Sequence, residues 1–447
     1  MYIDREGKSG YNGIEKKCSW LQKNAMEGST LEIKRDDYLK KLIAKENNGL
    51  IKVITGMRRC GKSYFLFTIF RNYLLETGVA EDHIIDMAFD SYENKQYRNP
   101  DVLYPYVKGK IADKGMYYIL LDEVQLLDEF ESVLNGFMRM PNVDVYVTGS
   151  NAKFLSKDII TEFRGRGDEL RMYPLSFREF MSNFNGNKYD GWNEYVLYGG
   201  LPLTVLLPTA EQKIEFLKRL FDETYINDIV GRHRIQNKEE FEELINILAS
   251  GIGSLTNPKK LADTFQTKKN KKISSNTIKN YLDYLCDAFV VSRASRYDIK
   301  GKKYIDSPQK YYFSDIGLRN ARINFRQVEE NHTMENIIYN ELLFRGYNVD
   351  VGLVAFTGKD SSGKAVHKQL EVDFVCNKGS KRYYVQSAFP IPDEAKMQQE
   401  ANSLQRIDDS FKKIIVVKDV SAPWYTDKGI LVIGIYDFLL NPGSLDL

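Results

Sequence analysis

Short apolar runs, partly β-branched, recur through the first part of the chain, and stretches with a helical pattern separate them. The five runs are Ile51 to Thr55, Ile84 to Phe89, Met116 to Leu121, Val143 to Thr148 and Glu169 to Leu175. Strands that alternate with helices are typical of a parallel sheet covered on both faces. The pattern therefore predicts an α/β domain, which we place at residues 31–175.

Two further patterns follow this domain. Residues 176–237 are mainly helical in pattern, with a turn-forming segment at Tyr198 to Pro202, and we expect a helical lid or connector. Residues 238–330 contain apolar positions spaced by three and four, N-cap candidates and then two strands that flank a Lys300-Gly301-Lys302 turn. The apolar positions are Phe241, Leu244, Ile245 and Leu248, and then Ile278, Tyr281, Leu282, Leu285 and Phe289. The N-cap candidates are Ser274, Ser275 and Asn276, and the two strands are Val290 to Asp298 and Tyr311 to Ser314. Helices followed by such a wing predict a winged-helix domain.

Residues 331–447 read as a second α/β unit. A helix at Met334 to Phe344 precedes the strands and a polar helix. The strands are Tyr347 to Phe356, Leu370 to Cys376, Arg382 to Phe389, Lys413 to Val417 and Ile430 to Ile435. A chain of 447 residues exceeds one hydrophobic core, so several domains are expected.

Composition is that of an ordinary folded protein, with 43% apolar and 28% charged residues. Residues 1–30 are polar and contain Met26, and we interpret them as a tail, or as leader sequence ahead of the true start. No run reaches the length of about 20 apolar residues that crosses a bilayer, and no secretory signal is evident, so we predict a cytoplasmic location. The four cysteines lie far apart and indicate neither a zinc site nor a disulfide framework; they are Cys18, Cys60, Cys286 and Cys376.

A phosphate-binding motif follows the first strand. The segment Gly56 to Ser63 fits G-x-x-x-x-G-K-[ST], whose glycines let backbone N–H groups face the β-phosphate. Lys62 is expected to reach the β- and γ-phosphates and Ser63 to ligate magnesium. The motif opens a helical stretch, whose N-terminus favours anions. The predicted ATP-binding residues are Gly56, Met57, Arg58, Arg59, Cys60, Gly61, Lys62, Ser63 and Tyr64; for Arg58 and Arg59, simple solvent exposure is the alternative.

Two acids end the third strand. Asp122 and Glu123 follow an apolar run and therefore lie at the carboxyl edge of the sheet, where ligands bind in open α/β folds. We predict that Asp122 holds magnesium through Ser63 or water, and that Glu123 orients or deprotonates the attacking water. A solvated acidic strand end is the alternative.

Further polar residues follow the fourth strand. Asn151, with Ser150 in reserve, is a candidate for contact with the γ-phosphate or the attacking water. Arg164 and Arg166 are candidates to neutralise charge that develops on the γ-phosphoryl group, in cis or across a subunit interface of a homo-oligomer. The alternative is that these arginines pair at the surface with Glu162 or Asp168.

Taken together, the motifs resemble those of prokaryotic AAA-type ATPases that carry a C-terminal domain of unknown function. The likeness covers about residues 31 to 440 and rests on ordered motifs, so it is specific. They are the phosphate loop with its double arginine, Leu121 to Gln125, Thr148 to Asn151, Arg164 to Arg166, Tyr173 to Phe180, Tyr198 to Pro202, Tyr312 to Leu318 and Glu371 to Phe374. The resemblance implies an additional-strand catalytic-glutamate core, a winged helix and a C-terminal fold similar to restriction-type nucleases.

The nuclease pattern is incomplete. Such enzymes use a helix acid, a strand acid and an acid-x-Lys on the next strand to hold magnesium and activate water. Glu335 and Asp373 match the first two, but Gln386 and Ala388 stand in the third motif. We therefore predict an inactive domain with a binding or scaffolding role, in which Glu371 or Glu341 would restore chemistry only through an unusual geometry.

Charge is unevenly distributed along the chain. The net charge is only +2, yet residues 252–310 hold 13 Lys and Arg against 5 Asp. A basic patch on a winged helix suits DNA phosphates, with Lys268 to Lys272 and Lys300 to Lys303 as its prominent runs. Solvated basic loops and protein contacts are the alternatives.

The leading hypothesis is an ATPase that binds and hydrolyses Mg-ATP to switch a DNA- or protein-bound assembly. A nucleotide-gated adaptor with little turnover is the second hypothesis, and an ATP-dependent nuclease is the third. The protein partner is not indicated by any motif.

Overall fold

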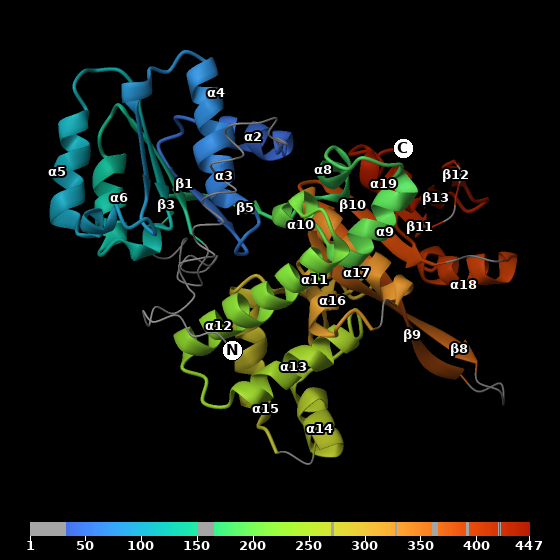
Figure 1. The fold of residues 1–447 in the computed structure, drawn as a ribbon. Helices are drawn as coiled ribbons and strands as arrows, with labels where there is room; N and C mark the ends of the chain where they lie inside the picture. Colours follow the sequence, from blue (N-terminus) through green and yellow to red (C-terminus); the bar gives the residue numbers. More distant parts are fainter. Residues whose placement is uncertain are drawn as a thin grey trace. The chain divides into compact units, whose positions relative to one another are not determined.

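Figure 1 shows the fold of the chain in a computed structural model. It describes residues 33–149, 165–269, 272–326, 329–359, 365–389, 393–418, 420 and 422–447. The predicted N-terminal tail, residues 1–30, lies outside the described residues. The chain divides into Met1–Lys34 and a second unit, Arg35–Leu447, which contains every element discussed below.

A parallel five-stranded sheet forms the first part of this unit. Its strands are β1 (Ile51–Gly56), β2 (Ile84–Ala88), β3 (Tyr117–Asp122), β4 (Val143–Thr148) and β5 (Gly167–Met172). They lie in the order β2-β3-β4-β1-β5, and all neighbours are parallel. The five predicted strands are thus confirmed, and β4 is the additional strand between the phosphate-loop strand and the strand that ends in Asp122.

Helices cover both faces of this sheet, which is why its strands are apolar on both sides. On one face, α5 (Pro100–Lys110) and α6 (Phe130–Met138) share a core with residues such as Val53 and Leu121. The other face contacts α2 (Asp36–Ile43) and a continuous helical segment (Figure 1). That segment comprises α3 (Lys62–Tyr64), the π-helical η1 (Phe65–Phe70) and α4 (Arg71–Glu76); short 3-10 turns are η2 (Glu81–His83), η3 (Lys95–Arg98) and η4 (Val124–Leu126).

The region after the sheet is helical, as predicted. It contains α8 (Phe177–Met181), α9 (Lys188–Tyr198), α10 (Pro202–Leu206), α11 (Ala210–Arg219), the π-helical η6 (Leu220–Ile226) and α12 (Asn227–His233). Leu217 and Phe221 of this region belong to the same buried cluster as Ile54 and Phe65 of the first domain. The boundary drawn at residue 175 therefore marks a change of pattern, while the hydrophobic core continues across it.

Three helices and a hairpin follow. The helices are α13 (Lys238–Ser250), α14 (Pro258–Lys269) and α15 (Ser275–Asp287), and the hairpin strands are β6 (Val291–Asp298) and β7 (Lys303–Phe313). Ser274 caps α15 by accepting a hydrogen bond from the Thr277 N–H, as its position predicted. Thr256 and Gln309 exchange backbone hydrogen bonds of 2.9 and 2.8 Å, which join the loop before α14 to the hairpin.

The hairpin also belongs to the C-terminal sheet, so strand pairing crosses the predicted boundary at residue 330. β6 pairs in parallel with β8, so one eight-stranded sheet runs in the order β12-β13-β11-β10-β9-β8-β6-β7. The remaining strands are β8 (Asn348–Lys359), β9 (Ala365–Lys378), β10 (Lys381–Ala388), β11 (Lys412–Val417), β12 (Trp424–Tyr425) and β13 (Leu431–Gly434). The helices are α16 (Ile316–Arg322), α17 (Glu330–Phe344), α18 (Glu394–Gln405) and α19 (Ile435–Leu440). Because the paired strands are far apart in sequence, no local sequence pattern predicts their pairing.

Within the described part of the chain, no helix combines the length and the hydropathy required of a membrane span.

Candidate nucleotide site

The loop between β1 and α3 has the backbone geometry of a phosphate cradle. Gly56 and Gly61 adopt φ of 144° and 98°, which favour glycine. A Cβ on Gly56 would lie 2.2 Å from the Met172 carbonyl oxygen of β5. The first N–H groups of the helix that begins at Lys62 have no intrahelical acceptor and are available to an anion. The loop therefore fits a phosphate group, and glycine is required at residue 56.

The Lys62 side chain is folded into this loop. Its ammonium donates to the Gly56 and Met57 carbonyl oxygens at 3.0 and 3.1 Å, and the residue is only 5% exposed. A buried ammonium that is satisfied by its own loop is ready to exchange these carbonyls for phosphate oxygens, which are stronger partners because they are charged.

Asp122 lies beside this loop. It is 3% exposed, and its carboxylate accepts hydrogen bonds from the Thr148 and Ser63 hydroxyls. Burial raises the pKa of Asp122 to about 6, although the two hydroxyls act in the opposite direction. The predicted magnesium pair, Ser63 and Asp122, is thus brought together from α3 and β3. A hydroxyl and a carboxylate are oxygen ligands of the kind that magnesium prefers.

Glu123 turns the chain directly after β3. It has φ of 51°, and its backbone N–H donates to the Thr148 hydroxyl oxygen at 3.2 Å. Its carboxylate accepts a hydrogen bond from the Gln125 side chain. The left-handed conformation is uncommon for a residue with a Cβ, and it persists only where the surrounding structure fixes the backbone, as it does at this edge of the sheet.

Thr148 was missed as a site residue in the sequence. It is the last residue of the additional strand β4, is fully buried, and contacts both Asp122 and Glu123 through one hydroxyl. Two sequence signals pointed to it, its place at the end of a strand and its place in the segment Thr148 to Asn151 that carries the family resemblance, but Asn151 of that segment was preferred. Asn151, Ser150 and Arg164 lie outside the described residues.

Arg166 lies at the opposite edge of the sheet from the phosphate loop. The Arg166 carbonyl accepts from the Ile51 N–H at the start of β1, whereas the loop begins at Gly56. Six residues of strand correspond to roughly 20 Å, so Arg166 does not reach the phosphate loop of its own chain. Its side chain donates to Asn135 at 3.1 Å, while Asp168, an alternative partner by sequence, contacts Lys45. The position of Arg166 therefore corrects the prediction that its side chain acts on the nucleotide of its own chain.

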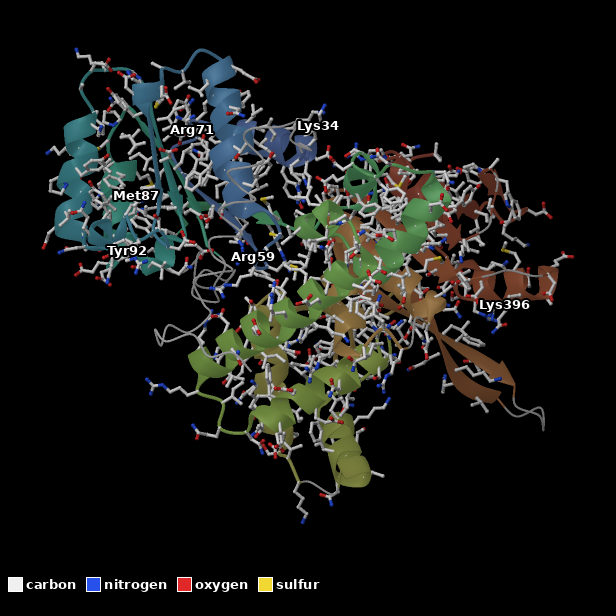
Figure 2. The ribbon with its side chains drawn as sticks, viewed as in Figure 1. Lys34, Arg59, Arg71, Met87, Tyr92 and Lys396 are labelled. Atoms are coloured by element: carbon white, nitrogen blue, oxygen red, sulfur yellow. The ribbon has the colours of Figure 1, made fainter. Side chains whose placement is uncertain are left out.

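The helical region touches the phosphate loop directly. The Tyr225 hydroxyl donates to the Arg58 carbonyl oxygen at 2.6 Å, and the Arg58 guanidinium lies 3.5 Å from the Asp228 carboxylate. Solvent exposure thus describes Arg58 only in part, because the side chain is 40% exposed and ion-paired. Arg59 is exposed and adopts φ of 65°; Figure 2 shows it just before the helical segment on which Arg71 lies farther along.

Comparisons with known proteins agree with this geometry. Residues 48–181 match a family described as an AAA domain, and residues 189–329 match a domain of unknown function. An uncharacterised protein of Haemophilus influenzae is 34% identical over 415 residues, which cover 92% of this chain and 99% of that protein. An uncharacterised protein of Methanocaldococcus jannaschii is 30% identical, covering 83% of this chain and 82% of its own length.

The chain belongs to the family of these relatives. Its nucleotide domain is an AAA domain with a P-loop, on a parallel α/β sheet. The ORC1 protein of Aeropyrum pernix, solved in complex with DNA, is a structural neighbour with 11% identity and a TM-score of 0.28; it covers 67% of this chain and 95% of its own. At that TM-score the likeness says nothing about function.

The basic region of this AAA-domain protein is less exposed than its composition suggests. Lys310 is 4% exposed and lies among acids, and Arg293 pairs with Asp283. Exposed lysines remain on α14, in the loop after it, on α15 and at the hairpin turn: Lys259, Lys260, Lys272, Lys279, Lys300, Lys302 and Lys303.

The residues of the predicted nuclease pattern lie on α17 and on the C-terminal sheet of the same protein. Glu335 on α17 and Asp373 on β9 both face Lys310, while Gln386 contacts the backbone N–H of Asp373 at 3.3 Å. Glu371 joins the cluster through Lys310 at 2.7 Å, whereas Glu341 pairs with Arg345 at 2.7 Å. Glu341 therefore has a partner of its own.

Proposed function

We propose that this protein binds and hydrolyses Mg-ATP and that its helical region responds to the nucleotide state. The observation that supports this most strongly is the network around Thr148, in which one hydroxyl contacts both acids of the β3 end beside the P-loop. A P-loop alone is compatible with nucleotide binding without turnover. The additional strand, by contrast, ends in Thr148, whose contacts with Asp122 and Glu123 support the roles that we propose for these acids as magnesium ligand and activating group.

In this proposal, residues 56–64 hold the triphosphate, and Ser63 with Asp122 holds magnesium. Bound Mg-ATP supplies a γ-phosphoryl group whose transfer to water is strongly favourable. Lys62 leaves the Gly56 and Met57 carbonyls and donates to phosphate oxygens. Glu123 accepts the proton of the attacking water, after release from the hydrogen bond with Gln125.

The helical region is proposed to sense this change through three contacts. Tyr225 and Asp228 bind Arg58, and Pro202, the first residue of α10, lies beside Gly61, where an added Cβ would be 3.6 Å from its ring. A bound phosphate that pulls the loop inward moves Arg58 and thereby changes its contacts with Tyr225 and Asp228. This is a differential contact of the kind that any nucleotide-driven switch requires.

The first test compares two variants in a phosphate-release assay and in calorimetry with Mg-ATP. We expect Lys62→Ala to lower ATP affinity roughly 100-fold or more, because charge-assisted hydrogen bonds to two phosphates are lost. Glu123→Gln is expected to bind ATP normally and to hydrolyse it about 100- to 10,000-fold more slowly. Lys108→Ala, which changes an exposed lysine of α5, is the matched control. Undiminished turnover in the Lys62 variant would refute the site.

We also propose that the exposed lysines of α14, of α15 and of the loop between them contact DNA phosphates. Replacement of Lys259, Lys260, Lys272 and Lys279 by glutamine should weaken the mobility shift of a DNA duplex and reduce the salt dependence of binding by up to about four ions. The same replacement at Lys95, Lys108, Lys110 and Lys114 in the AAA domain is the control. An equal effect of both sets, or no shift at low salt, would reject the DNA surface.

A further inference from the structure

A lysine from the hairpin sits among the three acids of the nuclease-like domain. The Lys310 ammonium on β7 lies 2.8 Å from Glu335 of α17 and 2.7 Å from Glu371 of β9. Asp373, two residues farther along β9, is 3.7 Å away. Three elements distant in sequence therefore converge on one positive charge.

This cluster is enclosed. Lys310, Glu335 and Asp373 are 4%, 7% and 8% exposed, and the Glu371 side chain is 32% exposed. The protein supplies further hydrogen bonds: the Tyr312 hydroxyl donates at 2.6 Å to the same Glu335 oxygen that Lys310 contacts, and the Ser387 N–H donates at 2.8 Å to the second oxygen of Asp373. Carboxylates this buried require a cation and hydrogen bonds, and here both are supplied by the chain itself.

The charges of the cluster agree with a resident ammonium group. Burial lowers the pKa of Lys310, but Glu335, Asp373 and Glu371 more than offset this effect and keep the group protonated. Burial, followed by the charge of Glu335, raises the pKa of Asp373 to about 8. One ammonium thus faces three carboxyl groups, and the raised pKa of Asp373 favours its protonated form.

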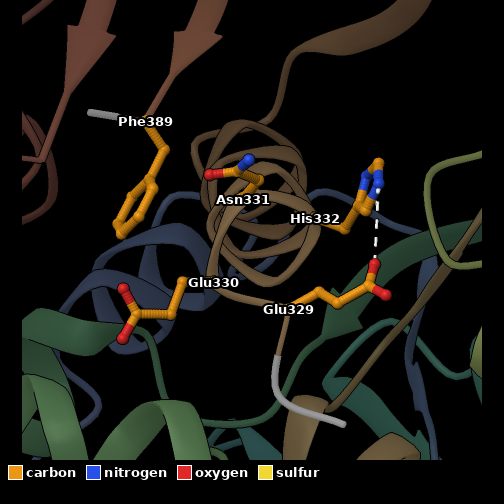
Figure 3. A pocket seen from close by; sticks show the side chains of 5 residues that line it. All are labelled: Glu329, Glu330, Asn331, His332 and Phe389. Carbon is orange, nitrogen blue, oxygen red and sulfur yellow. Dashed lines mark ion pairs between the residues drawn. The ribbon is translucent and has the colours of Figure 1, made fainter. Parts of the chain in front are cut away.

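The cavity next to this cluster is also unsuited to a phosphodiester. It has a volume of about 410 Å³ and lies at the start of α17, one turn before Glu335 (Figure 3). Two of its lining residues are Glu329, which lies 3.8 Å from His332, and Glu330, which accepts from Lys418 at 2.9 Å. Because the cationic partners of these acids are already paired, the cavity offers no surplus positive charge to the phosphates of a nucleic acid.

We propose that Lys310 is a built-in replacement for the divalent cation of the nuclease-like fold. Its ammonium occupies the centre of the acid cluster and ties the hairpin to α17 and β9 without metal. The domain therefore retains the acids of a metal site as a structural ion-pair cluster and does not cleave DNA. Among the described residues, no group of three or more His, Cys, Asp and Glu side chains is arranged to hold a metal ion.

A catalytic lysine in a working nuclease also lies beside its acids, so the first experiment separates the two cases in the full-length protein. After EDTA treatment and without nucleotide, Mn²⁺ binding is measured by electron paramagnetic resonance for the wild type and for Asp373→Asn, and DNA cleavage is followed with Mn²⁺. We expect equal Mn²⁺ binding by the two proteins and no cut product. Mn²⁺ that is bound by the wild type and lost in Asp373→Asn, or cleavage that the substitution abolishes, would overturn the proposal.

A second experiment uses the gain of a metal site. Lys310→Met leaves the acids without a cation, and in EDTA we expect a melting temperature lower by roughly 5 °C or more. Mn²⁺ should restore much of this loss, and the added substitution Asp373→Asn should abolish the restoration. Lys303→Met, on the exposed start of β7, is the control and should respond to neither treatment. A Lys310→Met protein as stable as the wild type in EDTA would count against the cluster; if that variant does not fold, the wild-type comparison above still decides.

Discussion

At the scale of single residues, the site depends on one hydroxyl. Thr148 donates to Asp122 and accepts from the Glu123 N–H, so the proposed metal ligand and the proposed activating acid share one support. Asp122 is also the acid that burial perturbs most clearly at this site, with its pKa raised to about 6. A carboxylate kept from water is poorly solvated until a cation arrives, and this favours magnesium.

The raised pKa of Asp122 leads to a pH prediction. A carboxyl group whose folded pKa exceeds its unfolded value adds stability below the unfolded pKa, near 4, and loses that contribution as pH rises through about 6. In EDTA, we therefore expect the change in the free energy of unfolding caused by Asp122→Asn to be more favourable at pH 7.5 than at pH 4.5, by on the order of 2 kcal/mol. Thermal unfolding at both pH values measures this difference.

Loss of magnesium-dependent ATP binding should accompany this gain, because the amide is a weaker ligand than a carboxylate. Equal stability effects of Asp122→Asn at both pH values would show that the carboxyl group is not perturbed in the folded protein.

At the scale of elements, two motifs of the sequence meet at Asp315 instead of at the nucleotide. The Asp315 carboxylate accepts from the N–H groups of Gly200 and Leu318 at 2.8 and 3.0 Å, and it joins the turn before α10 to the start of α16. A Cβ on Gly199 would lie 2.3 Å from this carboxylate. The glycines of that turn thus serve close packing.

Removal of this carboxylate should destabilise the helical region. Asp315→Ala leaves buried N–H groups without an acceptor, and we expect a loss of about 3 kcal/mol, with a smaller loss for Asp315→Asn, which keeps one oxygen. Because α10 begins beside Gly61, ATP affinity should also fall in the Ala variant. Denaturant unfolding measures the stability, and Asp306→Ala on the exposed hairpin is the control. Asn and Ala variants of equal stability would argue against hydrogen bonding as the cause.

At the scale of the whole molecule, Arg166 lies too far from the phosphate loop of its own chain to act there. The register of β5 against β1 places it at the amino edge of the sheet, while Gly56 marks the carboxyl edge. If Arg166 contributes to catalysis, a second copy must bring it to the site, as in other assemblies that supply an arginine in trans.

A mixing experiment tests this arrangement. Arg166→Ala should retain ATP binding and lose at least roughly 100-fold in turnover, and Lys62→Ala should be inactive. Mixing the two inactive variants should restore part of the activity, because one interface then combines an intact phosphate loop with an intact arginine. An Arg166→Ala protein with normal turnover, or a mixture without recovery, would remove the role in trans.

The local pattern of the sequence determined much of this protein. The five strands of the first sheet, the helical region after it and the capped helix α15 were all predictable, because burial on both faces and capping are encoded within a few neighbouring residues. The P-loop and the two acids at the end of β3 were predictable for the same reason, since their spacing and their place at strand ends are local features.

Only the tertiary structure decided which distant residues meet. Strand order placed Thr148 between Asp122 and Glu123, strand register carried Arg166 to the far edge, and pairing of β6 with β8 brought Lys310 into the acid cluster. These contacts join segments separated by tens of residues, and their energies depend on burial and pairing that exist only after the chain has folded. For that reason a lysine that looked like part of a basic surface in the sequence is an internal counter-ion in the fold.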